Sequence, residues 1–173
     1  MRLQFPVVLL MLLAVSGCGA YVWGPGVGRA SGDSKKRAVS LQTVENRTFP
    51  NRPGLEYELT RRLKDEIVTN RRLVLSEGAS DVRLRVSLTR FDEPNLVEDL
   101  DTGQPAEILL KATAVVEAIG EEFPGGVSRR KVTVSTSYTP LLGDSRSAGL
   151  ERLWRDLVRE IVDVAADEEW ASE

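Results

Sequence analysis

The only cysteine of the chain, Cys18, is the residue whose setting most clearly indicates a chemical reaction. It ends the stretch Val15-Ser16-Gly17-Cys18, which follows an almost wholly apolar run over residues 6–15, with Arg2 ahead of the run. These are the features of a secretory signal peptide, and the run is too short to span a bilayer as a helix. The stretch resembles a bacterial lipobox. In a lipobox the cysteine is acylated and becomes the new N-terminus when the signal peptide is removed. The alternative is an ordinary signal peptide followed by a buried cysteine.

Composition excludes several classes of function. The chain has 23 basic and 26 acidic residues and a net charge of −3, which argues against a general nucleic-acid binder. It has no histidine. With Cys18 acylated, catalysis by histidine or cysteine, the usual zinc sites and an internal disulfide are all excluded. We therefore expect no cofactor and no metal.

One acidic motif resembles a catalytic one. Leu100-Asp101-Thr102-Gly103 matches the sequence around an aspartic-protease carboxylate, but that chemistry needs two such aspartates sharing a proton. Asp99 and Asp101 could open a calcium loop, yet Leu110 stands where a bidentate glutamate is expected. We predict a solvated turn here.

The periodicity of apolar residues predicts one α+β domain. We expect a signal peptide over residues 1–17, a lipidated flexible tether over 18–37 and the domain over 38–169. The order is strand, helix, three strands and helix, which predicts a two-layer sandwich with a four-stranded sheet and two helices on one face. Asn51 and Ser147 are the expected helix caps. The expected strands cover 38–45, 82–91, 107–118 and 128–138, and the apolar stripe of the first helix runs from Leu55 to Ile67.

Five basic residues share the polar parity of the predicted strands, although the protein as a whole is acidic. Clustered guanidinium and ammonium groups can bind phosphate or carboxylate through charge-assisted hydrogen bonds. The alternative is a polar sheet face that simply contacts water. The residues are Arg83, Arg85, Lys111, Arg129 and Lys131.

From Val39 onward the chain resembles the lipopolysaccharide-assembly lipoproteins, the LptE family. A strand ending in Asn-x-Thr, a Pro-Gly-Leu-Glu helix start and Leu-Thr within that helix are the family's usual opening. The Cys18-Gly19 pair after the signal peptide also fits. The matching stretches are residues 44–49, 53–56, 59–60, 63–67 and 80–84.

The resemblance implies a protein without enzymatic activity. Such proteins are anchored to the outer membrane by acyl chains and face the periplasm. They plug the β-barrel LPS-assembly protein LptD, help it to fold and engage lipopolysaccharide in transit. The basic sheet face would then bind phosphates of lipid A and the core. The alternative is a tethered structural or adaptor lipoprotein that binds envelope proteins and no lipid; a tethered hydrolase is less well supported by the residues present.

Lipidation of Cys18 gives a first testable prediction. Two or more acyl chains hold a protein stably at a membrane, whereas one chain binds only marginally. Gly19 follows the cysteine, where an aspartate would signal inner-membrane retention, so we expect outer-membrane residence. Metabolic labelling with a fatty acid should mark the wild-type protein and leave Cys18→Ala unlabelled. Equal labelling of both would contradict the lipobox assignment.

Overall fold

The computed structural model describes residues 36–167. The predicted signal peptide, most of the predicted tether and Cys18 therefore lie outside the described residues, as do residues 168 and 169 of the predicted domain. Arg37, which we assigned to the tether, is the first residue of a strand. Within residues 36–167, no helix is both long enough and apolar enough to cross a membrane.

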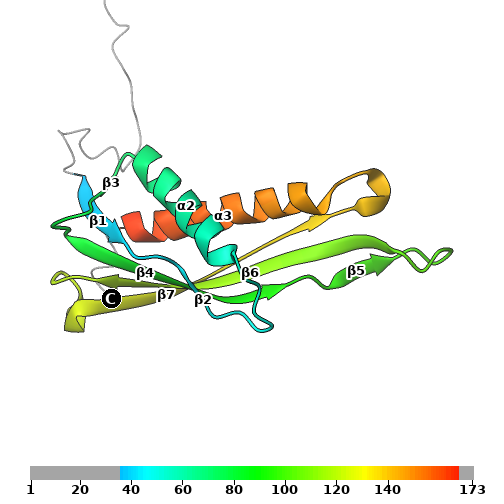
Figure 1. Ribbon diagram of the computed structural model, residues 1–173, viewed down its shortest axis with the longest axis horizontal. Coiled ribbons are helices and arrows are strands. Elements are labelled where there is room, and N and C mark those ends of the chain that lie inside the picture. The colour runs from blue at the N-terminus through cyan, green and yellow to red at the C-terminus, as the bar shows by residue number, and fades with distance from the viewer. Residues whose placement is uncertain (1–35, 168–173) are drawn as a thin grey trace, which may run out of the picture. The chain divides into compact units, whose positions relative to one another are not determined.

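The described residues form a mixed sheet with two helices over one of its faces (Figure 1). Short 3-10 turns, η1 (Pro124–Gly126) and η2 (Pro140–Leu142), join the later elements. The strands and helices are β1 (Arg37–Leu41), β2 (Glu45–Asn46), α2 (Leu55–Thr69), β3 (Leu73–Leu75), β4 (Val82–Asp92), β5 (Asn95–Glu98), β6 (Pro105–Ile119), β7 (Val127–Tyr138) and α3 (Arg146–Ala166).

The sheet combines parallel and antiparallel pairs. β4 and β6 pair antiparallel, and β7 pairs antiparallel with the other side of β6. β1 pairs parallel with both β3 and β4, and β2 continues this side of β4. Helix α2 is the crossover between the parallel strands β1 and β3, as parallel pairing requires.

The predicted number of strands was wrong: the sheet has seven strands, not four. The expected strand at 38–45 is divided into β1 and β2, because the Val44 N–H donates to Thr60 Oγ1 at 2.9 Å instead of joining the ladder. β3 has three residues, too few to show an alternating pattern. The stretch between the expected strands 82–91 and 107–118, where we predicted no strand, contains β5, whose four residues are all exposed and so carry no apolar alternation.

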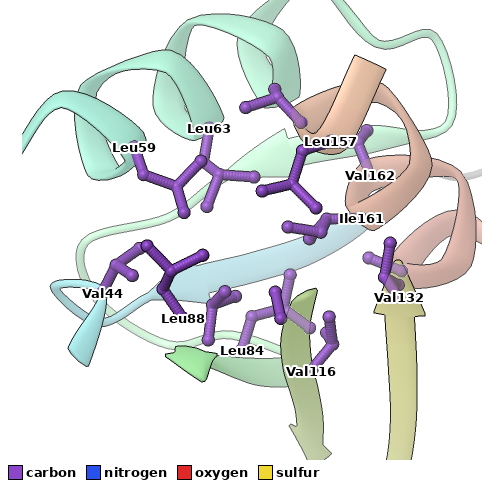
Figure 2. Close-up of a cluster of buried hydrophobic side chains, with 14 of the residues drawn as sticks. Val44, Leu59, Leu63, Leu84, Leu88, Val116, Val132, Leu157, Ile161 and Val162 are labelled. Atoms are coloured by element: carbon purple, nitrogen blue, oxygen red, sulfur yellow. The ribbon is translucent and has the colours of Figure 1, made fainter. Parts of the chain in front are cut away.

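The α+β class and the placement of both helices on one sheet face are confirmed. Figure 2 shows Leu59 and Leu63 of α2 pointing toward Leu84 and Leu88 of β4. From the other helix, buried side chains of α3 point toward β6 and β7. The predicted stripes are therefore the core, because period 3.6 in the helices and period 2 in the strands bring these residues to one layer. Its fully buried members include Val39, Leu59, Leu63, Ile67, Leu84, Leu88, Leu110, Leu153, Leu157 and Ile161.

Neither helix begins at the predicted cap. The residue before α2 is Gly54, at φ 96°, with no side-chain cap, so Asn51 does not serve as one. A positive φ suits glycine because it has no Cβ. At α3 the cap is Ser145, whose Oγ accepts a hydrogen bond from the Ala148 N–H at 3.2 Å, and Ser147 lies inside the helix.

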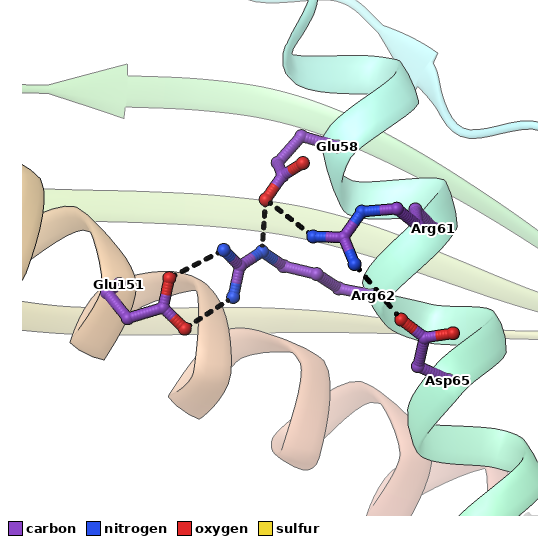
Figure 3. Close-up of polar contacts among 5 residues, drawn as sticks. All are labelled: Glu58, Arg61, Arg62, Asp65 and Glu151. Atoms are coloured by element: carbon purple, nitrogen blue, oxygen red, sulfur yellow. Dashed lines mark hydrogen bonds and ion pairs between the residues drawn. The ribbon is translucent and has the colours of Figure 1, made fainter.

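An ion-pair network joins the two helices on their outer side (Figure 3). The Arg62 guanidinium donates to both carboxylate oxygens of Glu151, at 2.6 and 2.8 Å, and through Nε to Glu58 at 2.5 Å. Hydrogen bonds from Arg62 hold the pKa of Glu151 below its usual range. Because Glu151 is largely exposed, this network contributes little to the free energy of unfolding. We infer that its main effect is to fix the orientation of the two helices relative to each other.

Packing of α3 on the sheet gives the second prediction. Leu157 is fully buried, so Leu157→Ala should lower the free energy of unfolding by about 2–5 kcal/mol. Leu142→Ala removes the same atoms from a side chain that is 85% exposed, and should change it by less than about 0.5 kcal/mol. Denaturant unfolding of both variants measures the difference. Equal stability would show that α3 does not pack on the sheet as described.

Candidate anion-binding face

The five predicted basic residues all lie on the sheet face opposite α2 and α3, which we call the open face. Cross-strand pairing aligns Arg85 with Glu117, and Glu117 with Arg129. The neighbouring rows hold Arg83 and Lys131. The predicted parity is therefore correct for strands β4, β6 and β7, because alternate residues of a strand share a face.

Lys111 does not belong with the other four. It pairs with Asp92 on β4 and with Ser135 on β7. Four residues along β6 separate it from Val115, the partner of Lys131, which corresponds to about 14 Å of strand. The other four residues occupy successive rows, opposite or beside Ile119, Glu117 and Val115, so that each row lies only two residues from the next. The structure thus brings together Arg83, Arg85, Arg129 and Lys131, and we call these four residues the cationic cluster.

Glu117 lies inside the cationic cluster and was not among the residues predicted from the sequence. Its Oε2 is 3.5 Å from Arg85 Nη1, and its Oε1 is 3.4 Å from Arg129 Nε. One carboxylate thus orients two guanidinium groups and offsets part of their charge. Glu117 is an even number of residues from Lys111 in the same strand, so strand parity was the signal that placed it on this face.

Two members of the cluster keep their charge available. Arg83 and Lys131 make no ion pair within residues 36–167, and both are exposed. Two other arginines on the face are paired with carboxylates: Arg90 lies 2.7 Å from Asp92, and Arg47 lies 2.5 Å from Glu45. We therefore place the strongest anion attraction at Arg83 and Lys131.

Apolar side chains alternate with the cations on the open face. Ile119 and Val127 share a row with Arg83, and Val115 stands between Ser87 and Lys131. Val127 is 48% exposed. A surface with cations beside apolar groups suits a ligand that carries both anionic and apolar parts. The anionic parts bind the guanidinium groups, and the apolar parts are removed from water against the apolar side chains.

A hollow of about 650 Å³ opens at the Arg83 end of the face. Its lining includes Arg83, Ile119 and the carboxylates of Asp81, Glu121 and Glu122. Asp81 accepts a hydrogen bond from the Ala38 N–H at 2.9 Å, and Glu122 pairs with Arg37. The hollow therefore has mixed charge and shares Arg83 with the cationic cluster.

The remaining sequence motif is a turn, as predicted. Asp99 Oδ1 accepts hydrogen bonds from the N–H groups of Asp101 and Thr102 and from Thr102 Oγ1, at 2.8–3.1 Å. Those bonds, led by the one from the Thr102 backbone, lower the pKa of Asp99. Its carboxylate therefore closes the turn between β5 and β6. Across residues 36–167, no group of three or more acidic, histidine or cysteine side chains is arranged to hold a metal ion.

Residues 36–167 thus form a mixed sheet with two helices over one face and the cationic cluster on the other. The family model described as LptE, lipopolysaccharide-assembly, matches residues 37–164. The chain therefore belongs to the LptE lipopolysaccharide-assembly family, which confirms the resemblance seen in the sequence. No curated protein matches the sequence significantly.

Solved structures share the fold. A hypothetical protein from Chlamydia trachomatis superposes with a TM-score of 0.57 at 13% identity, over 79% of this chain and 98% of that one. A protein from Xanthomonas campestris gives 0.56 at 11% identity, over 80% and 88%. The rare lipoprotein B from Shewanella oneidensis gives 0.51 at 20% identity, over 73% and 93%. At these identities the likeness concerns the fold alone.

The position of Glu117 gives the third prediction. Glu117→Gln keeps the side-chain size, removes the negative charge and releases Arg85 and Arg129. We expect binding of purified lipopolysaccharide to tighten by about two- to fivefold, the range of an exposed ion pair. Glu160→Gln, on the exposed side of α3, makes the same charge change away from the face and is the control. Titration of both variants should separate them; weaker binding by Glu117→Gln would contradict the assigned role.

Proposed function

We propose that this protein is an outer-membrane lipoprotein that plugs the LPS-assembly barrel LptD, helps it to fold and assists lipopolysaccharide transport to the cell surface. It acts without enzymatic activity, anchored through acylated Cys18 and facing the periplasm. Family membership supports the general role in lipopolysaccharide assembly. The observation that supports direct contact with the lipid is the cationic cluster, which lies on a protein of net charge −3.

The chemistry of the cluster suits lipid A. Arginine binds phosphate through two parallel hydrogen bonds, so Arg83, Arg85 and Arg129 match phosphate groups in geometry as well as in charge. Val115, Ile119 and Val127 offer apolar surface beside them for the start of an acyl chain. Since net charge repels lipopolysaccharide, attraction depends on these local groups and weakens as salt rises.

Anchoring determines how the face reaches its ligand. Cys18 and β1, which begins at Arg37, are separated by 18 residues, and an extended chain spans at most about 3.6 Å per residue. That length allows the domain to lie well clear of the bilayer surface to which the acyl chains hold it. The domain can thus enter a neighbouring barrel while it stays attached to the membrane.

Charge reversal on the open face gives the fourth prediction. Arg83→Glu with Lys131→Glu removes the two members of the cationic cluster that make no ion pair within residues 36–167, and neither side chain is in the core. We expect binding of purified lipopolysaccharide to fall by about tenfold or more, since hydrogen bonds to charged groups contribute about 1.5–3 kcal/mol each. The measurement is a titration at two salt concentrations, with circular dichroism and melting to verify the fold.

The matched control for this experiment is Lys64→Glu with Arg159→Glu. It makes the same change in net charge on exposed positions of α2 and α3, away from the open face. The control should bind as the wild type does. Equal loss in both variants would mean that net charge alone governs binding, and full binding by the open-face variant would remove direct lipid contact from the proposal.

The barrel partner is tested separately. The full-length, tagged protein is purified from detergent-solubilised membranes, and its partners are identified by mass spectrometry. Recovery of LptD supports the plug role. Recovery of other envelope proteins in its place, together with no lipopolysaccharide binding, would favour a tethered adaptor.

A further inference from the structure

The loop over residues 47–54, between β2 and α2, carries one aromatic side chain that is almost fully exposed to solvent. Phe49 is 97% exposed, whereas its neighbour Thr48 is only 7% exposed. A fully exposed phenylalanine gains nothing from the core of its own domain. Large aromatic side chains do, however, dominate the binding energy of many protein interfaces.

The loop is held in shape by Asn46. Its Oδ1 accepts hydrogen bonds from the Thr48 N–H at 3.2 Å and from Thr48 Oγ1 at 2.8 Å. Its Nδ2 donates to the Arg52 carbonyl at 2.7 Å and to Glu56 at 3.0 Å. One side chain therefore joins both ends of the segment that carries Phe49.

A second set of contacts fixes the loop to the rest of the fold. The Arg52 guanidinium lies 4.6 Å from the centre of the Phe91 ring and pairs with Glu93. Glu93 also binds Arg146 at the start of α3, at 2.7 and 2.9 Å. The hydrogen bond from Arg146 is the main cause that lowers the pKa of Glu93. The backbone that bears Phe49 is thus tied to both β4 and α3.

We infer that Phe49 is an anchor that inserts into an apolar pocket on the β-barrel partner, with Asn46 as the residue that positions it. This inference rests on the proposed function and names the part of the chain through which the barrel is bound. A rigid loop loses little conformational entropy on binding. Burial of an aromatic side chain on such a loop therefore contributes more to affinity than burial of the same side chain on a flexible loop.

The charges around Phe49 favour a protein pocket over a lipid surface. Binding to a membrane surface relies on apolar area together with cations that attract anionic lipids. Here Arg47 is paired with Glu45 at 2.5 Å, Arg52 and Arg146 share Glu93, and Glu56 adds a third carboxylate beside Asn46. The surroundings of Phe49 therefore offer matched charges and one rigid ring, which suits a shaped, uncharged cavity.

The test uses the full-length, membrane-extracted complex. Phe49→Ala should speed dissociation of LptD from the immobilised protein by about tenfold or more, the size typical of a hot spot. Leu100→Ala, at a side chain that is 100% exposed on the β5–β6 turn, is the control and should leave dissociation unchanged. A photoreactive phenylalanine analogue at position 49 should also cross-link to LptD. Equal effects of the two alanine variants, or no effect of Phe49→Ala, would overturn the inference.

The positioning role of Asn46 is tested through Phe49. Asn46→Ala keeps the ring and releases the loop, so it should weaken binding less than Phe49→Ala does. If Asn46 acts through Phe49, the double variant should bind no more weakly than Phe49→Ala alone. Additive losses would show that Asn46 merely stabilises the fold, and would overturn its role here.

The failures of the two proposals can be told apart. If wild-type protein retains LptD and Phe49→Ala retains it equally, the plug role stands and the anchor is wrong. If wild-type protein retains no LptD, the plug role fails and the anchor fails with it. Loss of binding to lipid vesicles in Phe49→Ala, with LptD retention intact, would assign Phe49 to a membrane surface and overturn the inference.

Discussion

Burial of one face of the sheet beneath α2 and α3 is the constraint on which the rest of this structure depends. Leu84, Leu88 and Leu110 can leave water only if the helices cover them, and Leu59 and Leu157 can do so only against that sheet. Burial of apolar surface is the main favourable term in folding. Every strand that contributes to this layer must then direct its alternate residues to the opposite face.

The open face follows from that alternation. Arg83, Arg85, Arg129 and Lys131 gather because their neighbours along each strand belong to the core. Glu117 limits the repulsion among them by pairing with two of the four. A protein with an acidic average can in this way carry a local surface that attracts phosphate, and nearby apolar residues extend that surface to amphiphilic ligands.

A large part of this arrangement could be predicted from the sequence, because long elements repeat their pattern. The stripe through Leu59, Leu63 and Ile67 and the alternation from Val82 to Leu88 identified the core. Shorter elements left too little pattern: β3 has three residues, and β5 buries none. The parallel pairing of β1 depends on where the α2 crossover returns the chain, and local periodicity carries no information about that.

The binding features show the same division. Parity placed all five predicted cations on the correct face, yet only cross-strand register separates Lys111 from the other four. Glu117 could have been found by the same parity. The loop that displays Phe49 could not, since its shape depends on hydrogen bonds between Asn46 and three residues, Thr48, Arg52 and Glu56, and no periodic pattern predicts these bonds. Asn46 and Thr48, which form the Asn-x-Thr stretch of the family resemblance, thus hold that loop in shape in this protein.

Direct contact between lipopolysaccharide and the open face is the central claim of this account. Its most direct test is lysine footprinting of the full-length protein in detergent, with and without purified lipopolysaccharide, read by mass spectrometry. Lys131 lies in the cationic cluster, whereas Lys64 is exposed on α2. The account predicts that lipopolysaccharide slows modification of Lys131 and leaves Lys64 unchanged. Unchanged modification of Lys131, or equal protection of both lysines, would contradict it.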